Sequence, residues 1–204
     1  MRRKITAVLL GAVAAVLPAA AAEIQVHLPP ESTTIGFSLK ATMHTVHGTA
    51  SLDRADFTFD TVSGAASGEA VVVSGSADTD SEKRDKKMHS KVLLSSEHQR
   101  IAIRAESIEG TLELDGTSEV VLVGTMELIG ASHPIRVPMT VTIDGDTATV
   151  DAAFSVPYVE WGLKDPSTFV LRVGKEVPVT IHAENVRVER IAGAEIEGDS
   201  SISP

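Results

Sequence analysis

Apolar and polar residues alternate along most of this chain, and this period of two constrains the fold more than any other feature. From Ile135 to Ile143, every second residue is apolar. Successive side chains point to opposite faces of a strand, so the alternation predicts strands with one apolar face. The pattern recurs between Thr33 and Val188 in segments about as long as a barrel strand. A sheet with one apolar face must cover that face or close on itself, so the pattern favours a closed barrel.

About eight strands can be placed in this way, the number at which a closed barrel encloses room for one small ligand. The predicted strand segments are 33–39, 44–52 with 56–60 as its continuation, 67–77, 99–108, 118–129, 133–143, 147–156 and 177–188. Residues 144–146 read Asp-Gly-Asp, which is typical of a hairpin turn. Residues 186–188 fall out of phase with 177–183, and this predicts a bulge near 184–185.

One segment, residues 81–94, breaks the alternation. Met88, Val92 and Leu93 lie at helical spacing there, with charged residues on the other side. The polar run 78–81 before it supplies candidates for the helix N-cap. The segment therefore predicts an amphipathic helix of about three turns that crosses one end or flank of the barrel.

Residues 1–22 have the pattern of a cleaved secretion signal. Three basic residues at positions 2–4 precede an apolar run at 5–17, and small residues follow up to Ala22. The apolar run is short for a membrane anchor, and no charged stop-transfer segment follows it. We therefore expect cleavage before Glu23 and a location in the periplasm of a Gram-negative cell, or secretion.

The rest of the chain predicts one domain and a tail. About 180 residues remain after cleavage, enough for a single domain with a sizeable core. No linker interrupts the strand pattern, so we expect one barrel domain at 23–191. Residues 192–204 are acidic and rich in small side chains, so this tail should be disordered. Cysteine is absent, so no disulfide contributes to the fold.

The charge of the chain excludes one class of partner. Of its 18 Lys and Arg residues, three lie in the signal, which leaves 15 against 28 Asp and Glu, a net charge of −13. A protein with this charge is soluble and is repelled by nucleic acid and by anionic lipid surfaces. We expect neither nucleic-acid binding nor stable membrane insertion.

Four pieces of the chain, in a fixed order, resemble a known family. They are 35–39 with 44–48, 76–79 with 83–88, 124–135, and 154–167. Together they span residues 32–190 and are similar to the YceI-like family of periplasmic lipid-binding barrels. The resemblance implies an all-β fold, an extended eight-stranded antiparallel barrel of lipocalin-like form with one short amphipathic helix. It also implies frequent homodimers and an interior that holds a polyisoprenoid, an isoprenoid quinone or a related long amphiphile, with no other cofactor.

The apolar rows provide the candidate ligand-binding residues. These are Ile35, Phe37, Leu39, Val46, Val71, Val73, Ile101, Ile103, Leu122, Met126, Leu128, Ile135, Val137, Met139, Val141, Phe154, Val179 and Ile181. Trp161, in a loop-like segment, is a candidate lid or packing residue. Each of these residues has an alternative role in ordinary core packing, because small barrels can be filled by their own side chains.

Five polar residues are candidates for the rim of the barrel or for a ligand headgroup: His44, His47, Arg84, Asp85 and His133. His44 and His47 are three residues apart, so in an extended strand they point to opposite faces and cannot share a metal unless the strand bends there, which Gly48 would allow. Arg84 could grip a headgroup, but we favour a structural role for Arg84 and Asp85.

Motifs of hydrolases, metalloproteases and phosphate-binding loops are absent from the sequence, so no catalytic or metal-binding residues are assigned. The function that the pattern favours is a carrier of an apolar small molecule. Two alternatives stay open. One is a barrel with a filled core that acts through a protein partner, in a stress response or a redox complex. The other is a metal-dependent enzyme that uses His44, His47 or His133.

Overall fold

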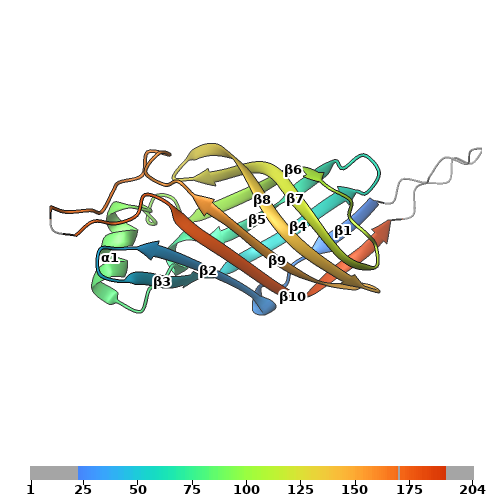
Figure 1. Ribbon diagram of the computed structural model, residues 1–204, viewed down its shortest axis with the longest axis horizontal. Coiled ribbons are helices and arrows are strands. Elements are labelled where there is room, and N and C mark those ends of the chain that lie inside the picture. Colours follow the sequence, from blue (N-terminus) through green and yellow to red (C-terminus); the bar gives the residue numbers. More distant parts are fainter. Residues whose placement is uncertain (1–22, 170, 192–204) are drawn as a thin grey trace, which may run out of the picture.

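Eight strand positions close into an antiparallel barrel in the computed structural model, which describes residues 23–169 and 171–191 (Figure 1). The strands are β1 (Glu23–His27), β2 (Thr33–Lys40), β3 (Thr45–Ala50), β4 (Leu52–Asp60), β5 (Ala66–Val73), β6 (Arg100–Glu109), β7 (Gly116–Leu128), β8 (Ala131–Asp144), β9 (Thr147–Val156) and β10 (Val177–Ile191). The all-β barrel predicted from the alternation is therefore confirmed. The expected signal and tail lie outside the described residues.

The barrel closes through β10, whose two halves pair with different strands. Its first half, Val179–Ala183, pairs with β2, and its second half, Arg187–Ile191, pairs with β1. The short helix η1 (Pro30–Ser32) separates β1 from β2, so these two strands share one position in the barrel. In the same way β3 and β4 form one interrupted strand beside them, because β1 pairs with β4 and β2 with β3.

The predicted bulge in the last strand is confirmed, and it lies where β10 changes partner. The register between β10 and β9 shifts between Ala183 and Val186, and Asn185 has a φ of 54°. The hydroxyl of Ser32 donates a hydrogen bond of 2.7 Å to the carbonyl oxygen of Glu184. The interruption between β1 and β2 therefore contacts the bulge directly.

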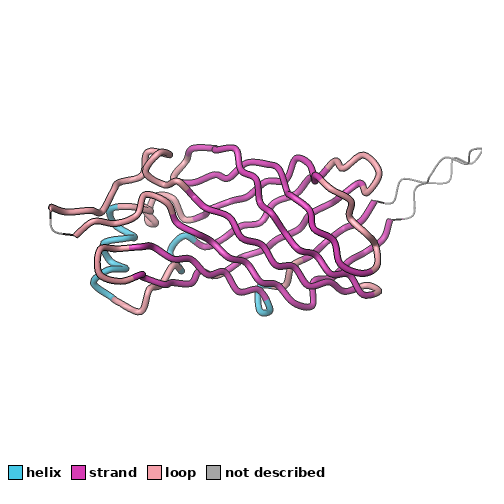
Figure 2. Tube along the Cα trace, in the orientation of Figure 1, coloured by secondary structure: helices cyan, strands magenta, loops and turns pink. Residues whose placement is uncertain are grey.

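The two ends of the barrel differ. At one end, which we call the helix end, lie the tight turns 41–44 and 129–130 and the long connections 74–99 and 157–176 (Figure 2). The first long connection contains η2 (Ser74–Ser76) and α1 (Glu82–Lys91), so the predicted helix is confirmed. The start of β1 and the end of β10 lie at the opposite end, the terminal end (Figure 1).

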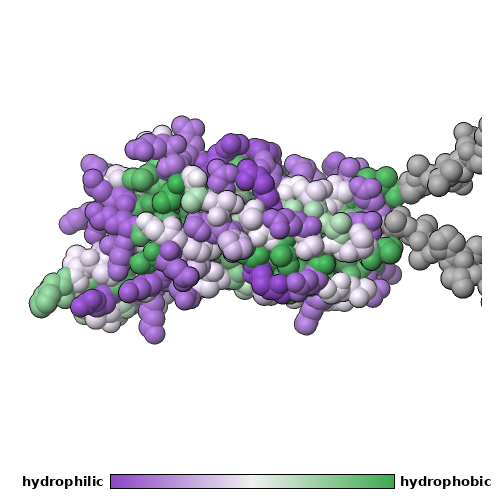
Figure 3. Space-filling model, turned by 90° about the horizontal axis from the view of Figure 1, so that it is seen from above, coloured by the Kyte–Doolittle hydropathy of each residue, from purple (hydrophilic) through white to green (hydrophobic). Residues whose placement is uncertain are grey.

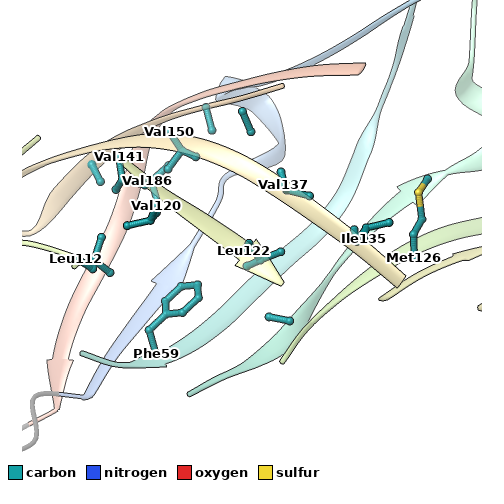
Figure 4. Close-up of a cluster of buried hydrophobic side chains, with 14 of the residues drawn as sticks. Phe59, Leu112, Val120, Leu122, Met126, Ile135, Val137, Val141, Val150 and Val186 are labelled. Carbon is teal, nitrogen blue, oxygen red and sulfur yellow. The ribbon is translucent and has the colours of Figure 1, made fainter. Parts of the chain in front are cut away.

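A packed core fills the terminal half of the barrel. Ile24, Val186 and Val188 are at most 1% exposed, and the ring of Phe59 lies among the side chains around them (Figure 4). Leu112, from the connection between β6 and β7, is also buried in this cluster. This half of the barrel is filled by its own side chains.

One predicted strand was wrong in its length and its phase. The segment 67–77 was expected to be extended throughout, but β5 ends at Val73 and η2 follows. Val72, not Val71 or Val73, faces the interior cavity. The outward face is set by Glu69, which forms ion pairs with Arg54 and Arg104 on the outside of the barrel.

Candidate ligand cavity

The helix end of the barrel is hollow and contains a cavity of about 640 Å3. Inward side chains of seven strands line it, and α1 and the connection 157–176 border its opening. Met126, Leu128 and Val156 belong both to the packed core and to the cavity wall. The core and the cavity therefore share part of one wall, near the helix-end tips of β7 and β9.

Strand β10 marks where the hollow half ends. Its inward residues Val177, Val179 and Ile181 line the cavity and are only partly buried, although they point into the barrel. The next inward residues, Ala183 and Val186, are 0% exposed. The change from open cavity to packed core therefore falls between Ile181 and Ala183, just before the bulge.

The apolar face of α1 covers part of the cavity. Met88, together with Val92 and Leu93 just beyond the helix, contributes to the lining. His89 fixes the other face of the helix, because its Nδ1 lies 3.0 Å from the hydroxyl of Ser95 and its Nε2 lies 2.9 Å from the carbonyl oxygen of Ala77. These contacts hold α1 against the chain that leads into it.

A compact polar cluster holds the start of α1. The Asp85 carboxylate accepts hydrogen bonds from the Thr79 hydroxyl at 2.5 Å, the Thr79 amide at 3.2 Å and the Ser81 amide at 3.3 Å. Arg84 donates through Nε to the Thr79 hydroxyl oxygen at 2.6 Å and through its guanidinium to the Thr79 carbonyl oxygen. Desolvation of Asp85 disfavours its charge, but the hydrogen bonds from Thr79 and Ser81 outweigh this and lower its pKa. The cluster supports the structural role that we favoured for Arg84 and Asp85.

A glycine makes room for the aromatic ring that lies across the cavity wall. Phe37 on β2 faces Gly48 on β3. A Cβ atom at position 48 would lie 2.4 Å from the Phe37 ring and 2.5 Å from the Asp78 carbonyl oxygen. Only glycine fits here without displacement of the ring or of the chain that leads to α1.

The connection 157–176 is anchored by the only tyrosine. The hydroxyl of Tyr158, a lining residue, donates a hydrogen bond of 2.8 Å to the carbonyl oxygen of Gly174. Burial, and to a smaller extent the nearby charge of Asp165, raises the pKa of Tyr158 to about 12. The phenol therefore stays neutral and joins the two ends of this connection beside the cavity.

All charged side chains in the described lining are cations. They are Lys83, Arg84 and Lys87, and all three come from α1. Lys83 and Lys87 are exposed, and Lys87 Nζ lies 3.4 Å from the carbonyl oxygen of Pro166. The mouth of an otherwise aliphatic cavity therefore has positive charge on one side.

Eleven of the predicted ligand-binding residues lie together in the cavity lining: Ile35, Phe37, Leu39, Val46, Ile101, Ile103, Met126, Leu128, Phe154, Val179 and Ile181. Eight lie outside it: Val71, Val73, Leu122, Ile135, Val137, Met139, Val141 and Trp161. Of these, Leu122, Ile135, Val137 and Val141 are buried in the hydrophobic core, where they fill the barrel themselves. Figure 4 shows Leu122 and Val137 within this cluster.

The predicted rim residues do not form one group. His44 and Arg84 line the cavity, whereas Asp85 lies in a shallow hollow on the other side of α1. His47 is exposed on the outer face of β3, opposite in phase to the lining residue Val46. His133 lies in neither place, because its ring stacks on Trp161.

Sequence reasoning did not assign several lining residues. Among them are Val72, Thr79, Lys83, Lys87, Met88, Val92, Leu93, Val156, Tyr158, Leu163, Leu171, Val173 and Val177. The helical spacing of Met88, Val92 and Leu93 was a usable signal, because it had already placed their face against the barrel. The connection 157–176 has no periodic pattern, so its contribution was not visible in the sequence.

Within the described ranges, no three His, Asp or Glu side chains gather in a way that could hold a metal ion. In the same ranges, no helix is long and apolar enough to span a membrane.

A closed antiparallel β-barrel with a half-hollow, apolar interior is the architecture of barrels that enclose one small ligand. The YceI-like domain family matches residues 27–185, and this chain belongs to that family.

Solved structures show the same fold. BcnA from Burkholderia cenocepacia superposes with a TM-score of 0.63 at 17% identity, and the match covers 79% of this chain and 99% of that one. A polyisoprenoid binding domain from Saccharophagus degradans gives a TM-score of 0.57 at 14% identity, over 80% of this chain and 98% of that one. The YCEI protein of Campylobacter jejuni gives a TM-score of 0.50 at 11% identity, over 76% and 85% of the two chains. No curated protein matches this sequence significantly.

Proposed function

We propose that this protein is a periplasmic carrier that holds one long-chain apolar amphiphile, such as a polyisoprenoid or an isoprenoid quinone, in the helix-end cavity. The observation that carries the proposal is the aliphatic lining of a cavity that adjoins the packed core and has an open, polar mouth. Such a shape suits a flexible chain that enters end-on and leaves its head at the mouth.

The energetics favour a hydrocarbon ligand. Each methylene transferred from water to an apolar interior contributes about 0.8 kcal/mol before ordering costs, so a long chain binds without directed polar contacts. Branched aliphatic residues such as Ile101, Ile103 and Val179 make up most of the wall, and they set no specific hydrogen bond inside it. The polyisoprenoid-binding relative from Saccharophagus degradans adds support for an isoprenoid chain.

The residues at the mouth support a position for the polar head of the ligand there. Lys83, Lys87 and His44 can reach a polar or anionic head there, whereas Arg84 is engaged with Thr79. We assign the protein no catalytic step of its own. The alternative of a metal-dependent enzyme that uses His44, His47 or His133 receives less support, because these residues lie in three separate environments and, among the described residues, none of them gathers with two further His, Asp or Glu side chains.

The periplasmic location rests on the pattern of residues 1–22. Cell fractionation and N-terminal sequencing of the product test it. We expect a soluble periplasmic protein that begins at Glu23. A chain that retains Met1 in the cytoplasm would remove the periplasmic part of the proposal.

The carrier itself is tested by extraction of the purified protein. The protein should be expressed with its leader in a Gram-negative host, purified without detergent, and extracted with organic solvent for mass spectrometry. We expect a long-chain lipid at about one molecule per barrel, and rebinding of polyprenol or quinone by the delipidated protein. Lipid-free preparations that also fail to rebind any chain would favour the filled-core accessory protein instead.

A further inference from the structure

The most exposed large apolar side chains of the described residues surround the mouth of the cavity. Phe169 is 96% exposed and Met43 is 89% exposed. Leu171, which lines the cavity, is 41% exposed. Figure 3 shows apolar surface at the tip of the molecule opposite the grey termini. A single exposed apolar side chain is common, but several gathered at one place mark an interaction site.

Hydrogen bonds join the backbone segments that carry these side chains. The Thr168 amide donates to the Leu171 carbonyl oxygen at 2.8 Å, and the Leu171 amide donates to the Thr168 hydroxyl at 3.1 Å. These two bonds close a turn around Phe169. The Thr42 amide donates to the Arg172 carbonyl oxygen at 3.0 Å, and the Arg172 amide donates to the Thr42 hydroxyl at 2.9 Å. The turn that presents Met43 is thus joined to the one that presents Phe169.

Two lysines lie near the turns that carry Met43 and Phe169. Lys83 and Lys87 project from the exposed side of α1 at the mouth, and the contact of Lys87 Nζ with the Pro166 carbonyl oxygen connects the helix to this loop. No acidic side chain of the described residues lines the cavity beside them. Apolar tips next to lysines are the composition that binds the interface of an anionic bilayer.

The charge of the whole molecule is distributed unevenly. The helix-end connections 41–44, 74–99, 129–130 and 157–176 carry eight Lys and Arg and eight Asp and Glu. The rest of the described residues carry seven Lys and Arg and seventeen Asp and Glu. The negative charge that repels an anionic surface therefore lies on the walls and at the terminal end. Screening over about 8 Å at physiological ionic strength leaves the local charges at the mouth dominant on contact.

We propose that the helix end docks transiently on an anionic phospholipid bilayer through a surface formed by Met43, Lys83, Lys87, Phe169 and Leu171, the docking surface. The inference builds on the proposed carrier function and adds the membrane as the partner from which the chain is loaded. Phe169 and Met43 enter the interface, and the lysines contact lipid phosphates. The cavity mouth then faces the bilayer, so a hydrocarbon chain passes between them without crossing water, which would expose every methylene.

Flotation with vesicles tests the docking surface. Purified protein is mixed with vesicles of phosphatidylethanolamine and phosphatidylglycerol, or of phosphatidylcholine alone, at low and high salt. We expect binding to the anionic vesicles that falls with salt. Met43→Ser combined with Phe169→Ser should weaken it at least about tenfold. Lys83→Glu with Lys87→Glu should remove the preference for anionic vesicles. Val62→Ser is the matched control, because Val62 is 62% exposed at the terminal end.

A single tryptophan at the tip reports insertion directly. Phe169→Trp in a Trp161→Phe background should show a blue shift of its emission with anionic vesicles, and Val62→Trp in the same background should not. Equal binding by all variants, or no binding by any, would overturn the inference.

Two further readouts separate this inference from its rivals. One such outcome is that the Met43→Ser, Phe169→Ser double variant changes only the oligomeric state on a sizing column and leaves vesicle binding intact. That result would assign these two side chains to a contact with a second copy of the chain and would overturn the inference. Lipid content by mass spectrometry tests the carrier separately. Protein that floats with vesicles but never contains a lipid would refute the proposed function and still support the docking surface.

Discussion

The imidazole of His133 stacks on the indole of Trp161, with ring centroids 4.3 Å apart and planes inclined by 2°. His133 comes from the start of β8 and Trp161 from the connection 157–176, so the stack fastens that connection to the barrel wall. The Nε2 atom of His133 is buried without a hydrogen-bond partner. The ring contact, rather than a polar one, is thus what holds this side chain.

Loss of the stack should loosen the connection beside the cavity. His133→Ala should destabilise the fold by about 0.5–1.5 kcal/mol, the range for an aromatic pair. Trp161 is the only tryptophan, so its fluorescence should also shift to longer wavelength as it becomes more exposed to water. His47→Ala, on the outer face of β3, should leave the spectrum unchanged. If His133→Ala and His47→Ala give the same spectrum, the stack does not position Trp161.

The Asp85 cluster should make the helix end sensitive to acid. The folded state lowers the pKa of Asp85, so its contribution to stability is present above the unfolded pKa of about 3.9 and is lost as the pH falls through the folded value. Asp85→Asn should destabilise the protein by about 1 kcal/mol at neutral pH and flatten this acid dependence. Urea denaturation across the acidic range measures both. An unchanged pH profile would mean that Asp85 does not stabilise α1.

His182, on the outer face of β10, should contribute stability with the opposite pH dependence. Hydrogen bonds to Asp151 and then to Glu184 raise the pKa of His182, and its Nδ1 lies 2.7 Å from Asp151 Oδ1. Its contribution to stability is therefore full below the unfolded pKa of about 6.5 and is lost as the pH rises through the folded value. Asp151→Asn should bring the pKa of His182 down, as measured by NMR titration of the imidazole. Asp56→Asn, which removes the carboxylate beside His27, should leave the pKa of His182 unchanged.

The two halves of the barrel should respond differently to truncation. Leu122→Ala removes volume from the packed core and should cost about 2–5 kcal/mol, equally in lipid-loaded and delipidated protein. Phe37→Ala enlarges the cavity, where a bound chain can fill part of the space. It should therefore lower the melting temperature of the loaded form less than that of the delipidated form. Equal losses in both forms for Phe37→Ala would indicate that no chain lies against this ring.

The alternation predicted most of the strands, the barrel and the bulge, but it missed β1 and did not indicate which half of the barrel is hollow. Leu122 and Leu128 lie on the same inward face of β7, yet only Leu128 lines the cavity. A period of two reports which face is apolar and carries no information about what fills the space in front of it. That is decided by distant residues such as Ile24 and Leu112, which close the terminal half.

The phase of β5 and the role of the loop residues show a second limit. Three consecutive valines, 71–73, fit either phase, and the polar residues Ser67 and Glu69 would have set it correctly. His133 follows the inward phase of β8, but its partner Trp161 comes from a connection with no periodicity. Tyr158 and Leu171 also belong to this connection, so no periodic pattern predicted their place in the cavity lining. Contacts made by such connections depend on tertiary structure, which local patterns do not contain.

The central claim, that the helix-end cavity holds the chain, is tested most directly by filling it. Val179 points into the cavity, and its neighbour Thr180 points outward from the same strand and is exposed. Bound lipid per barrel, measured by extraction and mass spectrometry, should fall at least about tenfold in Val179→Trp, because the indole occupies the space of the chain. Thr180→Trp should retain the full amount. Full lipid content in a folded Val179→Trp protein would contradict the account.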